Sequence, residues 1–190
     1  MALKIFPDQE KKFQKQIDKT MAHIKLLTKR YDEAKDYIFK YSKQEKRHTE
    51  ARIIYSHIMA ALDEKKKSLA VLTKEDFYIS GLDCLEVYII NFELDRALHY
   101  IKENIKPLSE RQKIIIAFLK LSIFILKNRE ISHQIRKFND MIKKKKSYLK
   151  NLDWSFDELK LFLSYSLKKK RITKKQKNTI ENIIKKLTSK

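Results

Sequence analysis

The sequence predicts an all-α protein, and its composition is the first reason. The 190 residues include one Gly and two Pro, whereas Lys, Leu, Ile and Glu are abundant. Tight turns between strands and phosphate-binding loops both depend on glycine, while straight-chain residues such as Leu, Lys and Glu favour helices. A helical chain of this length is long enough to bury a substantial core.

An apolar stretch at residues 114–126, IIIAFLKLSIFIL, is the second reason. Eleven of its thirteen residues are apolar, and only Lys120 and Ser122 interrupt it. A helix without a polar face has to be covered by other helices, and this one is shorter than the ~20 residues that span a bilayer. We therefore expect the central helix of a bundle or solenoid, with four side chains inside: Ile115, Phe118, Leu121 and Ile125.

Capping signals are the third reason, because a Ser or Thr followed three residues later by an acidic or amide side chain is typical of a helix start. Pro7 favours a helix at the beginning of the chain, and Asn128 is a candidate cap after the apolar stretch. The capping signals predict further helix starts at Ser42, Thr73, Ser109, Ser155 and Thr173.

The helical spacing of apolar residues predicts about ten helices. The first, at residues 7–28, is expected to bury Phe13, Ile17, Met21, Ile24 and Leu27. The others are expected near residues 31–38, 51–62, 69–72, 77–91, 94–105, 110–126, 131–149, 158–167 and 176–187. Because the connections are short, consecutive helices should pack antiparallel, as five helical hairpins.

Two segments of the chain share a pattern, large-Asp-x-Ala-x-x-Tyr-Ile, at residues 31–38 and 94–101. They lie 63 residues apart, which leaves room for one more unit, and Ser68 is a small residue 34 positions after Ala34. The capping signals from Ser42 to Ser155 follow one another at intervals of 31, 36 and 46 residues. Such spacing indicates a helical repeat.

This pattern resembles the tetratricopeptide repeat, in a degenerate form, over residues 10–106. Ala34, Ala97, Tyr31 and Tyr88 stand where that family has its signature residues, although its first-helix Trp and turn Gly are absent. Beyond residue 107 only the rhythm of hairpins continues. The resemblance implies a short right-handed superhelix, or otherwise a bundle, that acts as a binding scaffold for a peptide or partner helix.

The net charge of +20 is unevenly distributed over what we expect to be a single domain, residues 1–190. Residues 1–110 hold 21 Lys and Arg against 18 Asp and Glu, and residues 111–190 hold 23 against 6. The near-neutral part (1–106) and the basic part (107–190) thus differ in partner chemistry: the basic part favours nucleic acid, anionic lipid or an acidic protein. Lys-rich codon usage is an alternative source of the charge, since Lys outnumbers Arg 36 to 8.

The basic part concentrates its cations in two segments, with Tyr148, Trp154 and Tyr165 nearby. Lysines that follow phosphates, interleaved with aromatic rings, suit single-stranded nucleic acid as well as acidic proteins. The residues predicted to contact an anionic partner are Lys143, Lys144, Lys145, Lys146, Lys168, Lys169, Lys170, Arg171, Lys174, Lys175 and Lys177.

Candidates for catalysis are few. Asp95, His99 and Glu103 lie at four-residue spacing on one helix face, where they could bind a metal or move a proton, but a solvated face with helix-supporting pairs explains them equally. No HExxH or paired CxxC motif occurs, and Cys84 has no neighbouring base in the sequence. We therefore expect no enzyme activity, no cofactor, no metal and no small-molecule substrate.

The expected function is a non-catalytic helical-repeat scaffold whose basic C-terminal half docks on an acidic partner or nucleic acid. The alternative is a direct DNA- or RNA-binding protein or regulator that uses the basic helices at 143–186. A protein partner is expected, nucleic acid is a second possibility, and no membrane span is expected. The single cysteine excludes an internal disulfide, and the first residues, MALKIFPDQE, show no secretory signal. These features favour a reducing cytoplasmic compartment.

Overall fold

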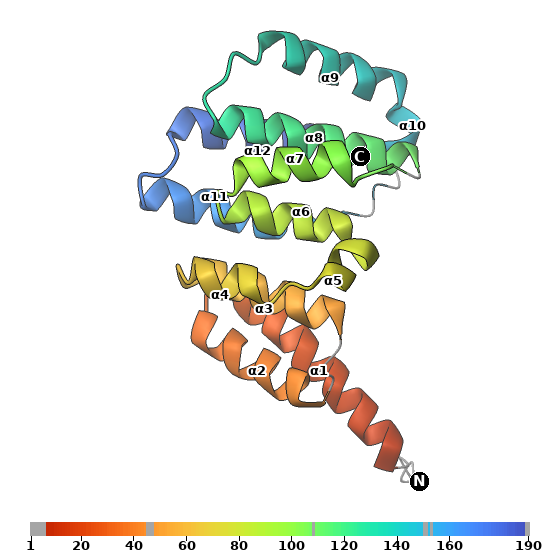
Figure 1. Cartoon of the computed structure of the whole chain (residues 1–190), viewed down its shortest axis with the longest axis vertical. Coiled ribbons are helices and arrows are strands. Elements are labelled where there is room, and N and C mark those ends of the chain that lie inside the picture. The colour runs from red at the N-terminus through yellow and green to blue at the C-terminus, as the bar shows by residue number, and fades with distance from the viewer. Residues whose placement is uncertain (1–6, 45–47, 108, 150–151, 153, 189–190) are drawn as a thin grey trace. The chain divides into compact units, whose positions relative to one another are not determined.

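The computed structural model describes residues 7–44, 48–107, 109–149, 152 and 154–188, and these residues form helices joined by short turns and loops (Figure 1). Twelve helices and no strand occur there, which confirms the all-α prediction. The helices are α1 (Pro7–Leu27), α2 (Tyr31–Gln44), α3 (Thr49–Ala61), α4 (Lys65–Ala70), α5 (Lys74–Ile79), α6 (Gly81–Ile90), α7 (Leu94–Glu103), α8 (Glu110–Leu126), α9 (Ser132–Lys144), α10 (Lys146–Leu149), α11 (Asp157–Lys168) and α12 (Lys174–Thr188).

The helices form two compact units, Met1–Val87 and Tyr88–Lys190, and the boundary falls within α6. We call them unit 1 and unit 2 and describe each by itself. The single domain expected from the sequence, with its change of character at residue 106, stays a prediction. None of the described helices is both long and apolar enough to cross a membrane.

Two of the expected helices are each divided in two, so ten become twelve. The backbone leaves the helical region at Ser80, with φ −133° and ψ 52°, which separates α5 from α6. Lys145, with φ −114° and ψ 25°, separates α9 from α10. At each break the backbone dihedrals change locally, while the apolar residues keep their helical spacing through the segment. The spacing of apolar residues therefore did not predict the breaks.

Three of the predicted capping signals are confirmed. The Ser109 hydroxyl accepts a hydrogen bond from the Gln112 N–H at 3.2 Å at the start of α8. Thr73 forms a full capping box with Asp76 at the start of α5. Thr173 does the same ahead of α12, where its hydroxyl accepts from the Gln176 N–H at 3.2 Å and the Gln176 Oε1 accepts from the Thr173 N–H at 2.7 Å.

Three other predicted caps are wrong. Ser42 lies inside α2, where its hydroxyl donates to the Phe39 carbonyl at 3.0 Å, a bond available to a serine in mid-helix. The Ser155 hydroxyl accepts from the Asp157 N–H at 3.2 Å, so Phe156 becomes the N-cap of α11. Asn128 has φ 53° and terminates α8 instead of beginning α9.

Five helices end in the same way, with a non-glycine residue in the left-handed region. In each case this residue donates to the carbonyl three positions earlier, and the next residue donates to the carbonyl five positions before it, at 2.8–3.1 Å. This is the Schellman motif, which usually employs glycine. Here the motif joins α1 to α2, α3 to α4, α6 to α7, α8 to α9 and α11 to α12. The five residues, with φ between 53° and 66°, are Lys29, Asp63, Phe92, Asn128 and Lys170.

The residue five positions after each of these left-handed residues differs between the first three helix pairs and the last two. Ala34, Ser68 and Ala97 occupy this position in α2, α4 and α7, and each is completely buried. In α9 and α12 the equivalent residues are His133 and Lys175, which are exposed. A small buried residue lets the second helix of a pair approach its neighbours closely, so the last two pairs are packed differently at this point.

In unit 1 the helix α1 packs against α2 and α3. Ala22 and Leu26 are buried in this contact, whereas Phe13, Ile17 and Ile24 are 64%, 51% and 46% exposed. The predicted buried row of α1 is therefore wrong for these three residues. The helix carries two apolar rows, and the row with the small Ala22 faces the neighbouring helices because it permits their close approach.

In unit 2 the helix α8 contacts α7, α9, α10 and α12 (Figure 1). Its predicted core residues Ile115, Phe118, Leu121 and Ile125 are all buried, at most 4% exposed, which confirms the central helix. The Phe118 ring packs edge to face on Phe156, with 5.0 Å between centroids. Such a contact adds about 0.5–1.5 kcal/mol to the burial of the two rings.

Candidate anionic-partner interface

The first predicted basic segment lies where α9 ends and α10 begins. Lys143, Lys144 and Lys146 are exposed. Lys145 forms an ion pair with Glu110, the first residue of α8. The hydrogen bonds from Lys113 and from Lys145 lower the pKa of the Glu110 carboxyl. Three of the four lysines are thus accessible to a partner, and the fourth ties α9 to α8.

The second predicted basic segment is the turn between α11 and α12 and the first turn of α12. Its exposed members are Lys168, Lys169, Lys170, Arg171, Lys174 and Lys175. Lys177 is paired with Glu181, with 2.6 Å between Nζ and Oε2.

The start of α12 is an unfavourable place for cations. No acidic residue stands in the first turn of this helix, where the dipole is positive and lysine costs about 0.3–1 kcal/mol. Lys174 and Lys175 both lie there. An anion bound at this point would relieve that repulsion.

The two basic segments lie at opposite ends of α8. Lys145 pairs with Glu110 at the beginning of that helix, whereas the Gln176 Nε2 donates to the carbonyls of Ile125 and Leu126 at its end, at 2.9 and 3.2 Å. With a rise of 1.5 Å per residue, these points are about 24 Å apart. The two basic segments are therefore separated by roughly one helix length.

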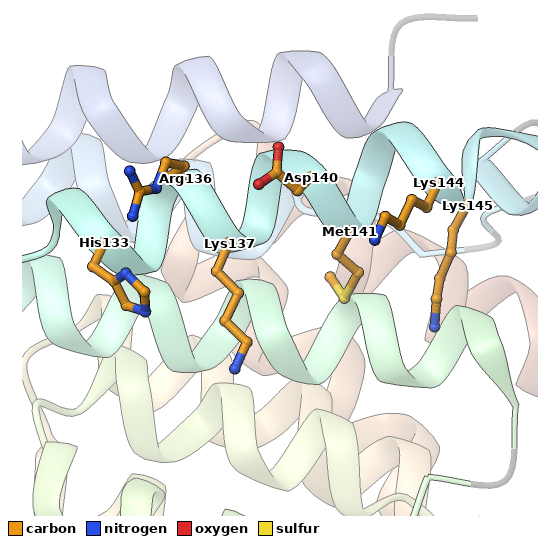
Figure 2. A pocket seen from close by; sticks show the side chains of 7 residues that line it. All are labelled: His133, Arg136, Lys137, Asp140, Met141, Lys144 and Lys145. Atoms are coloured by element: carbon orange, nitrogen blue, oxygen red, sulfur yellow. The ribbon is translucent and has the colours of Figure 1, made fainter.

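Further cations lie between these two ends, on α9, and sequence reasoning missed them. Arg136 and Lys137 are exposed, and with Lys144 and Lys145 they line a pocket of about 460 Å³. Figure 2 shows two rows of side chains at four-residue spacing along this helix. Asp140 is the one carboxylate among the lining residues. The same four-residue spacing is visible in the sequence, where we had considered only consecutive lysines.

The aromatic residues near the basic segments are mostly engaged within the chain. Lys169 and Arg171 lie over the Tyr165 ring, at 5.7 and 5.9 Å from its centroid. The Trp154 Nε1 is buried. Tyr148 is 44% exposed and is accessible to a stacking base. This offers less stacking surface than single-stranded nucleic acid usually finds on its binding proteins.

Unit 1 presents a pocket of a different kind. It measures about 440 Å³, and no carboxylate lines it. Aromatic and aliphatic side chains from α2, from α3 and from α4 with its C-cap meet there with a few polar groups, a composition common among ligand and peptide pockets. The lining residues are Phe39, Ser42, His48, Ala51, Arg52, Tyr55, Lys67, Ala70 and Val71.

The residues considered for catalysis or metal binding lie on α6 and α7. Asp95, His99 and Glu103 are exposed on α7, and Asp95 forms an ion pair with Lys127 of α8, which lowers the pKa of its carboxyl. Among the described residues no group of three or more His, Cys, Asp or Glu could hold a metal ion. Cys84 is completely buried, and desolvation raises the pKa of its thiol to about 12. Such a thiol stays protonated at neutral pH and is a poor nucleophile.

Comparison of the chain with protein-family models, with curated proteins and with solved structures finds no match.

Proposed function

We propose that the chain is a non-catalytic interaction protein, whose unit 2 docks on an anionic partner through its exposed cations. The observation that supports this best is the placement of charge. Residues 88–190 hold 26 Lys and Arg against 10 Asp and Glu. In the described part of this unit no carboxylate is buried, and the buried polar residues are neutral. The excess of positive charge is therefore carried by the surface.

The helix pairs support a scaffold of repeated hairpins. Five Schellman turns recur along the chain, and the first three are followed by a small buried residue at the same position. This is compatible with a tetratricopeptide-like stack over residues 10–106, in which the pocket of unit 1 would hold a segment of a protein partner. The last two pairs keep the turn but carry His133 and Lys175 instead, which suits an electrostatic role.

The test begins with capture of partners from a cell extract by the full chain, with and without nuclease treatment. We expect partners that remain bound after nuclease and that leave the chain as salt increases from ~50 to ~200 mM, because lysine contacts release counterions. Capture that disappears entirely after nuclease treatment would instead establish the nucleic-acid alternative. That alternative is favoured by Tyr148, an exposed ring two residues from the exposed Lys146.

A four-residue variant tests the charge itself, with Lys168, Lys169, Lys170 and Arg171 replaced by Gln. We expect weaker partner binding and a shallower dependence on salt. The stability should change by less than about 0.5 kcal/mol, because exposed cations contribute little. A matched control removes four exposed lysines of unit 1: Lys11, Lys12, Lys29 and Lys66. Equal loss of binding in both variants would mean that total charge, and not this surface, attracts the partner.

A further inference from the structure

A groove between α8 and α9 differs from the rest of the basic surface, because it combines an apolar floor with cationic walls. It has a volume of about 360 Å³. Each helix contributes four residues with the spacing i, i+3, i+4, i+7, so the groove follows both helices for two turns. The lining residues are Ala117, Lys120, Leu121 and Phe124 from α8, and Gln134, Lys137, Phe138 and Met141 from α9.

The floor of the groove is apolar. Leu121 and Phe138 are buried at its base, and Phe124 and Met141 are half-buried above them. Met is a flexible side chain that adapts to partners of different shape, and it is common at surfaces that accept helices. Apolar side chains of a partner would be removed from water here, which favours binding.

The walls of the groove are cationic. Lys120 and Lys137 occupy the i+3 position of their quartets, one on each helix, and both are exposed. Neither forms an ion pair with a described residue. Arg129 adds a third cation, since its guanidinium lies 5.6 Å from the centroid of the Phe124 ring. No carboxylate lines the groove.

We infer that this groove binds an amphipathic helix of a partner protein that carries acidic residues along both edges of its apolar face. A helix fits because an amphipathic helix binds by laying its apolar i, i+3, i+4, i+7 face into an apolar groove, and this groove has an apolar floor that extends over two turns of α8 and α9. Acidic edges fit because they would meet uncompensated lysines on both walls, which also speeds association. Nucleic acid would satisfy the lysines but leave the apolar floor unused. The inference rests on the proposed function and specifies its partner.

The test measures fluorescence anisotropy of a panel of labelled 16-residue peptides, with Leu at i, i+3, i+4 and i+7 and Glu beside them in varied registers. We expect at least one peptide to bind the full chain more than tenfold tighter than a scrambled peptide of equal composition. Reversing the walls with K120E and K137E together should weaken this binding at least tenfold. A peptide with Lys in place of Glu should then bind the reversed variant better than the parent.

A control variant reverses two lysines of unit 2 that do not line the groove, K102E and K106E, and should bind the peptide within threefold of the parent at the same net charge. If the reversed variant loses helix content by circular dichroism, K120Q with K137Q replaces it, with an expected loss of at least threefold. Equal binding of scrambled peptides, or equal loss in the control, would overturn the inference.

Two competitors identify other occupants. The inference is also overturned if no peptide binds the groove and laurate or a 20-base single strand binds there instead, with binding that depends on Lys120 and Lys137. The proposed function is judged separately, by salt-sensitive capture and its response to the four-residue variant at 168–171. If no peptide binds but the variant at 168–171 still weakens the salt-sensitive capture, only the inference about the groove is overturned. If the variant does not weaken this capture, the proposed function is overturned.

Discussion

The two units differ in how they use buried polar groups. In the described residues, all buried carboxylates belong to unit 1, where Asp18, Asp76 and Glu86 are at most 3% exposed. The buried polar residues of unit 2 are neutral, and they are Asn91, Ser122, Ser166 and Gln176. Unit 1 therefore has buried carboxylates in its interior as well as charged groups on its surface. Unit 2 keeps its interior neutral and exposes its cations.

Each unit contains a capping box whose third helical residue, Asp76 or Gln176, also forms a hydrogen bond with a distant helix. In unit 1 the Asp76 carboxylate accepts from the Thr73 N–H at 2.7 Å and from the Arg52 Nε at 2.8 Å. In unit 2 the Gln176 amide caps Thr173 and donates to carbonyls at the end of α8. The geometry is similar, but one connection is an ion pair that depends on pH and the other is neutral.

The largest expected effect is in the core of unit 2. Replacing Phe118 by Lys places an unpaired charge where the side chain is completely buried, and such changes cost about 4 kcal/mol or more, a large part of a typical total stability. We expect loss of the native fluorescence of Trp154, the single tryptophan, together with loss of helix content. The control is Phe13→Lys on α1, where the ring is 64% exposed and the free energy of unfolding should change by less than about 0.5 kcal/mol. Native fluorescence in the Phe118 variant would contradict the central role of α8.

The second effect concerns the ion pair of unit 1. Asp76→Ala leaves the Arg52 guanidinium without its main partner and removes half of the capping box of α5, so unit 1 should lose about 3–5 kcal/mol. Hydrogen exchange measured by mass spectrometry should show faster exchange in α3 and α5. The neighbouring exposed residue provides the control, because Glu75→Ala should leave exchange in α3 unchanged. Similar exchange in both variants would argue against the importance of the ion pair.

The third expected effect is a dependence of stability on pH that distinguishes unit 1 from unit 2. Burial raises the pKa of Asp76, but the hydrogen bonds from Arg52, Thr73 and Thr49 outweigh it and lower the pKa from 3.8 to about 2. This group therefore stabilises unit 1 above pH ~4 by about 2 kcal/mol, and the contribution is lost as the pH falls towards 2. Urea denaturation between pH 5 and 2 should show the loss in the parent protein and not in Asp76→Asn. An equal loss in both would assign the acid sensitivity to other carboxylates.

The fourth effect is the neutral counterpart in unit 2. Gln176→Ala removes the donor to the Ile125 and Leu126 carbonyls and half of the capping box, at a cost of about 1–3 kcal/mol. The loss should be the same at pH 4 and pH 7, because no charged group is removed. Asn178→Ala, an exposed change on the same helix, serves as the control and should alter the urea midpoint much less. A strongly pH-dependent loss would break the contrast between the two units.

Prediction from the sequence succeeded where short-range interactions decide structure. The helices, the confirmed caps at Thr73, Ser109 and Thr173, and the buried α8 all follow from apolar spacing and from hydrogen bonds between residues three or four apart. Their physical cause lies within one or two turns of chain, so the sequence contains it. The same reasoning found the two segments of consecutive lysines, since a run of charge needs no fold to be recognised.

The tertiary structure decided the rest. Both apolar rows of α1 are plausible core faces, and only the approach of α2 and α3 selected the row with Ala22 and left Phe13 outside. The second partners of Asp76 and Gln176 lie 24 and about 50 residues away, and the groove between Lys120 and Lys137 exists only because α8 and α9 pack together. Such contacts depend on which helices meet, a choice set by the packing of whole faces and not by any local pattern of residues.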